Sequence, residues 1–80
     1  MSRYEKIWQR IVSGQADRNI DFKDLIWLLE YKGFKKRHRG GSHIIFTKPG
    51  VSERITLQPE GSKAKEYQVR QVRAILMKQQ

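Results

Sequence analysis

The fold is decided by residues 33–50, which read GFKKRHRGGSHIIFTKPG. In this segment a basic run and an apolar run are separated by Gly40-Gly41 and followed by Pro49-Gly50. Glycine and proline pairs of this kind mark tight turns between short strands. The pattern therefore predicts an antiparallel meander of three strands, which cover residues 34–39, 42–48 and about 53–58.

The segments on either side carry apolar residues at the spacing of amphipathic helices. Asp21 stands at the N-cap position of the central helix, and Gly33 stands at the position that ends it. Ser2 and Glu5 have the spacing of a capping box at the start of the first helix. The pattern predicts three helices, at residues 4–12, 22–32 and 66–78.

This order of elements places the protein in the α+β class, with the helices on one face of a three-stranded antiparallel sheet. The opposite face of the sheet is left free to meet a ligand. Eighty residues suffice for a single domain, residues 1–80. No apolar run is long enough to span a membrane, and the lack of cysteine suits a reducing compartment. We therefore expect a cytoplasmic protein with no membrane partner.

The basic residues are concentrated in the second part of the chain, and the net charge is +9. Residues 1–30 contain five basic and five acidic side chains, whereas residues 31–80 contain twelve basic and three acidic ones. Such a positive field favours a polyanion: nucleic acid first, an acidic protein second and an anionic membrane surface third. A charge that serves only solubility is the remaining alternative.

His43 follows a glycine turn and precedes an apolar run. Alternation along a strand puts His43, Ile45 and Thr47 on one face and Ile44 and Phe46 on the other. If Phe46 belongs to the core, His43 is exposed. An exposed imidazole on a basic face suits RNA cleavage, because it can take a proton from the 2′-hydroxyl or give one to the leaving 5′-oxygen near neutral pH. A surface histidine that only forms hydrogen bonds is the alternative.

The position of His38 depends on the register of the first two strands. If Gly40-Gly41 is a two-residue hairpin loop, His38 lies opposite His43, and the two imidazoles could divide the acid and base roles. The same register places Lys35 and Arg37 on the core face, which is unfavourable for charged side chains. A one-residue bulge would reverse the facing of the whole first strand, so both registers remain open.

Basic residues near His43 are candidates for phosphate contacts, although cations in a strand can also serve only to protect a sheet edge from aggregation. The loop before the last helix adds two lysines beside helix amides that favour phosphate. No metal and no other cofactor is expected, because the two histidines lack carboxylates at ligand spacing. The candidate RNA-binding residues are Lys35, Lys36, Arg37, His38, Arg39, Ser42, Lys63 and Lys65.

The triplet Gly41-Ser42-His43 and the apolar residues 44–46 resemble the signature of the HicA toxins. A helix that ends at Gly33-Phe34, a basic strand and a final amphipathic helix occur in the same order in that family, and the resemblance covers about residues 21–78. It implies a double-stranded-RNA-binding-domain-like fold and metal-independent endoribonuclease activity against mRNA, with His43 as the catalytic residue. It also implies inhibition by a HicB antitoxin that covers the active face. Residues 1–20 add a helical extension that compact members lack.

A non-catalytic double-stranded RNA binding module has the same order of elements. In that alternative Lys63 and Lys65 would bind phosphates across a groove, and no reaction would follow. Such modules tend to carry a proline near their histidine, where this chain has Gly40-Gly41-Ser42. The turn before the second strand therefore favours the nuclease. A basic adaptor for an acidic protein is a third alternative.

Overall fold

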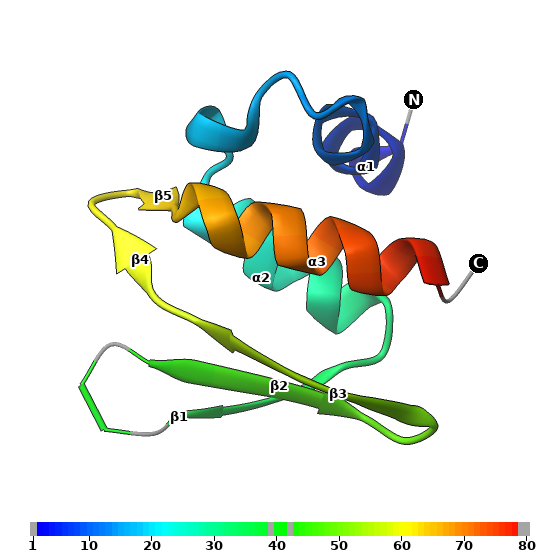
Figure 1. The fold of residues 1–80 in the computed structure, drawn as a ribbon, viewed down its shortest axis with the longest axis vertical. Coiled ribbons are helices and arrows are strands. Elements are labelled where there is room, and N and C mark those ends of the chain that lie inside the picture. The colour runs from blue at the N-terminus through cyan, green and yellow to red at the C-terminus, as the bar shows by residue number, and fades with distance from the viewer. Residues whose placement is uncertain (1, 39, 42, 79–80) are drawn as a thin grey trace.

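A computed structural model describes residues 2–38, 40–41 and 43–78 (Figure 1). The helical elements are α1 (Arg3–Ser13), the 3-10 helix η1 (Asp17–Asn19), α2 (Phe22–Tyr31) and α3 (Glu66–Lys78). The strands are β1 (Lys35–His38), β2 (Ile44–Lys48), β3 (Val51–Leu57), β4 (Pro59–Glu60) and β5 (Lys63–Ala64). The predicted α+β class and its three-stranded antiparallel sheet are confirmed.

The helices lie on one side of the sheet β1-β2-β3, and the other side is open (Figure 1). Side chains that alternate along the strands explain this layering. Ile44 and Phe46 of β2 and Ile55 and Leu57 of β3 are buried beneath the helices. Their neighbours on the opposite face are half-buried or exposed. Burial of one apolar face of the sheet against the apolar faces of α2 and α3 therefore holds the two layers together.

The observed register of β1 against β2 is not that of a two-residue hairpin loop. His38 pairs with Ile44, and Arg37 pairs with Ile45. β1 ends at His38 and β2 begins at Ile44, and the two-residue hairpin that would set His38 opposite His43 is therefore wrong. The observed register also places Lys35 opposite Thr47, on the open face. The strand ends predicted at Arg39 and Ser42 lie outside the described residues.

Two further differences from the predicted strands concern β3 and the segment that follows it. β3 begins at Val51, directly after the Pro49-Gly50 turn, which is earlier than predicted. The predicted strands ended at about residue 58, but Pro59 pairs with Ala64 and Glu60 pairs with Lys63. The second, two-stranded sheet thus formed leads the chain from β3 to the start of α3.

The ends of the helices follow the predicted chemistry with one exception. The capping box of Ser2 and Glu5 is present at the start of α1. Gly33 has φ of +95°, and the amides of Gly33 and Phe34 donate to the carbonyls of Glu30 and Leu29, as in a Schellman motif. Asp21 occupies the N-cap position of α2, but its side chain makes no capping hydrogen bond.

The N-terminal segment packs on the rest of the protein through three kinds of contact. Ile7 and Ile11 of α1 belong to the single core cluster. The ring of Tyr4 stacks on that of Tyr31 in α2, with centroids 4.9 Å apart. Arg73 of α3 donates to the carbonyl oxygen of Ile11 at 3.0 Å and to Oδ1 of Asp17 at 2.9 Å. Across the described ranges, no helix is both long and apolar enough to cross a membrane.

Candidate functional site on the open sheet face

The first candidate residue, His43, lies immediately before β2. Its side chain is exposed, as the alternation of buried residues in β2 predicted. His38, at the end of β1, pairs with the residue that follows His43. The two histidines therefore occupy the same end of the β1-β2 hairpin without being paired with each other.

A shallow hollow of about 390 Å³ lies on the sheet face that the helices leave open. Ile45 and Thr47 of β2 lie between the basic residues of the two neighbouring strands. The hollow is lined by Lys35, Arg37, His38, Ile45, Thr47 and Arg54. It thus brings together three of the predicted RNA-binding residues, and its His38 end lies next to His43.

The cations of this hollow are electrostatically uncompensated. Within the described part of the chain, Lys35, Arg37 and Arg54 form no ion pair. None of the eight acidic residues lines the hollow. Six of those eight pair with cations elsewhere in the molecule: Asp17, Asp21, Asp24, Glu30, Glu53 and Glu66. The open face therefore presents a positive field that is available to an anionic ligand.

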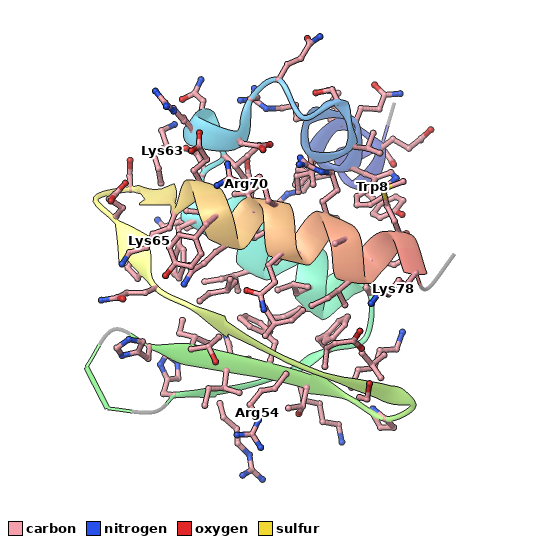
Figure 2. All side chains as sticks on the ribbon, viewed as in Figure 1. Trp8, Arg54, Lys63, Lys65, Arg70 and Lys78 are labelled. Carbon is pink, nitrogen blue, oxygen red and sulfur yellow. The ribbon has the colours of Figure 1, made fainter. Side chains whose placement is uncertain are left out.

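Arg54 is the residue of this face that was missing from the predicted set. Figure 2 shows its side chain projecting from the sheet on the side away from the helices. Its position follows from the burial of Ile55 and Leu57, because residues 54 and 56 then point to the opposite face. The alternation of apolar residues in the sequence could have indicated this facing. The predicted third strand, which started at about residue 53, did not show which residues Arg54 would lie beside.

The other predicted RNA-binding residues are placed differently. Lys36 reaches toward the helix layer, where its Nζ lies 3.7 Å from Oε2 of Glu30. Lys63 of β5 and Lys65, which follows this strand, lie on the helix side of the molecule (Figure 2). Nζ of Lys63 donates to Oδ1 of Asp21 at 2.6 Å, and Nζ of Lys65 donates to Oε1 of Gln58 at 3.2 Å. Arg39 and Ser42 lie outside the described residues.

Three carboxylates outside the hollow have shifted titration behaviour. The hydrogen bond from Lys63 lowers the pKa of Asp21 below its ordinary value. Hydrogen bonds from Arg18 and then Arg70 lower the pKa of Glu66. The pKa of Glu53 is lowered by a backbone hydrogen bond first and by Lys78 second. All three carboxylates therefore remain charged to lower pH and keep their cationic partners neutralised.

The fold and this face define a small basic α+β protein with an open sheet suited to polyanions. Comparison with known proteins gives the family: a family model described as the HicA toxin of bacterial toxin-antitoxin systems matches residues 22–80. The chain belongs to the HicA toxin family. No curated protein and no solved structure matches it. The three-stranded sheet with helices on one face is consistent with the double-stranded-RNA-binding-domain-like fold of that family.

Proposed function

We propose that this toxin is an endoribonuclease that cleaves mRNA in the cytoplasm, with His43 as its general acid or base. The observation that supports this most strongly is an exposed imidazole beside an uncompensated cationic face in a member of a toxin family. A cationic face concentrates RNA at the protein, and an imidazole exchanges protons near neutral pH. His43 lies at the end of the hairpin that carries His38, and His38 lines this face.

The proposed reaction needs only proton transfer and positioning. The 2′-oxygen attacks the adjacent phosphorus, while the bond from phosphorus to the 5′-oxygen breaks. His43 either removes the proton of the 2′-hydroxyl or protonates the departing 5′-oxygen, and water exchanges the other proton. A general acid or base accelerates such a step by about 10²- to 10⁴-fold. The candidate phosphate contacts remain Lys35, Lys36, Arg37, His38, Arg39, Ser42, Lys63 and Lys65.

We further propose a HicB-type antitoxin as the protein partner, in keeping with the toxin-antitoxin role of the family. Inhibition requires that the partner cover His43, and charge complementarity requires that it present carboxylates to the open face. We also propose that residues 21–78 form the active core and that residues 1–20 are an extension packed against it. A partner bound only to residues 1–20, with His43 uncovered, would contradict this arrangement.

Incubation of the purified protein with RNA, with and without EDTA, tests the activity and its independence of metal. Wild-type protein should cleave RNA in both conditions. His43→Ala should reduce the rate of cleavage by about two to four orders of magnitude. RNA affinity and the circular dichroism spectrum should stay near wild type, because one exposed side chain contributes little to stability. Undiminished cleavage by His43→Ala would refute the role of His43, whereas an inactive wild type that still binds duplex RNA would favour the binding module.

A further inference from the structure

The hollow beside β2 has the form of a track for one nucleic-acid strand. β1 and β3 flank β2, so the backbones of the two outer strands are about 10 Å apart, two strand spacings of roughly 4.8 Å. Lys35 and Arg37 stand on one side of the track, and Arg54 stands on the other. Ile45 and Thr47 form its floor. A basic groove of this kind follows a single sugar-phosphate backbone.

The track lacks the large aromatic side chains on which bases usually stack. None of the eight aromatic residues of the chain lines it. The two phenylalanines nearest in sequence, Phe34 and Phe46, are buried on the helix side. Contacts from cations and a hydroxyl group to phosphates and sugars carry no direct sequence information. Whatever binds in the track is therefore held with little dependence on its bases.

The cations that a duplex-binding module would use are already engaged within the protein. Lys63 is paired with Asp21, and Lys65 is hydrogen-bonded to Gln58. Figure 2 shows these two lysines on the helix side, whereas Arg54 projects from the opposite side of the sheet. One duplex would have to meet both surfaces to use all of these cations. The free cations thus favour a single strand on the open face.

Resting on the function proposed above, we infer that the open sheet face binds single-stranded RNA through its phosphates, with Arg54 as a binding residue. Arg54 lies beside Thr47, because Phe46 pairs with Ile55. Thr47 and His43 are four residues apart, or about 13 Å at roughly 3.3 Å per residue. Arg54 therefore holds a nucleotide other than the one cleaved at His43. It raises affinity without taking part in the proton transfer.

Binding measured by fluorescence anisotropy in the His43→Ala background tests this inference without cleavage of the RNA probes. The probes are short homopolymers of RNA, a short RNA duplex and a DNA homopolymer, which lacks the 2′-hydroxyl and is not cleaved. Arg54→Ala should weaken binding to all single strands, DNA included, by about tenfold. It should also lower the slope of log affinity against log salt by about one. Arg54→Lys keeps the charge and should restore most of that slope.

The control is Arg70→Ala, which removes the same charge from an exposed position on α3, far from the open face (Figure 2). Equal effects of Arg54→Ala and Arg70→Ala would overturn the inference, because only the net field would then matter. A strong preference for one base, or tighter binding of the duplex than of the single strands, would overturn it as well. An RNA-binding protein that fails to cleave would refute the proposed nuclease and leave this binding site standing.

Discussion

Replacing Arg73 by Met should destabilise the fold far more than loss of an ordinary surface charge. The guanidinium lies between α3 and the N-terminal segment, where it donates to Asp17 and to the carbonyl oxygen of Ile11. The side chains of Arg73 and Asp17 are only 21% and 10% exposed. Arg73→Met keeps a long side chain in place but leaves the carboxylate of Asp17 nearly buried without its cation.

The size of the loss follows from this burial. Breaking a fully buried ion pair costs about 3 to 5 kcal/mol, and the residual exposure of both side chains reduces that figure. We expect the free energy of unfolding to fall by about 2 kcal/mol. For a domain of this size the Tm should then fall by roughly 8 to 16 °C. Urea unfolding followed by circular dichroism gives the free energy, and calorimetry gives the Tm.

The matched control is Arg70→Met, one turn earlier on α3, where the ion pair with Glu66 is exposed. This variant should unfold close to wild type. The double variant Asp17→Asn/Arg73→Met should lose less unfolding free energy than the two single variants lose in sum, because no unpaired charge remains. If Arg73→Met loses no more stability than Arg70→Met, the ion pair does not hold the N-terminal segment in place, and this reasoning fails.

Three further results are expected. His38→Ala should raise KM by less than about tenfold and leave kcat near wild type, because His38 pairs with Ile44 and not with His43. A fall in kcat as large as that of His43→Ala would indicate that both histidines take part in catalysis. Stability to urea should decline below about pH 4, because carboxylates with lowered pKa values stabilise the fold above their ordinary pKa and lose that effect as they are protonated. Asp21→Asn should make this decline with pH less steep. An unchanged steepness would argue against the Lys63 contact. Gly33→Ala should cost about 1 to 2 kcal/mol in urea unfolding, because φ is +95° there, and a neutral substitution would show that the end of α2 adjusts freely.

The helices were predictable because their signals are local. The apolar spacing, the capping box and Gly33 all act within a few residues, and the ends of α2 and α3 fell within one residue of the prediction. The register of β1 was harder, because two rules disagreed. A glycine pair favours a two-residue loop, whereas charged side chains avoid the core. The structure resolves the conflict in favour of burial, with Lys35 and Arg37 outside and a longer loop.

Contacts between distant segments lay beyond the sequence pattern. Nothing in the local sequence around Arg73 pairs it with Asp17, which lies 56 residues earlier. The engagement of Lys63 by Asp21 is of the same kind, since it spans 42 residues. The hollow is formed by residues of three strands, so the sequence alone did not show that Arg54 lines it. That conclusion needed the pairing of β3 with β2.

The layered arrangement has a practical consequence for finding natural targets. The start of α1 and the end of α3 lie at the same side of the molecule, away from the β1-β2 loop and from the open face (Figure 1). An affinity tag attached at either end should therefore leave the open face accessible on a resin. Immobilised His43→Ala protein, which should bind transcripts without cutting them, can be cross-linked to cellular RNA by ultraviolet light. Sequencing the captured fragments would then identify the transcripts that the protein binds.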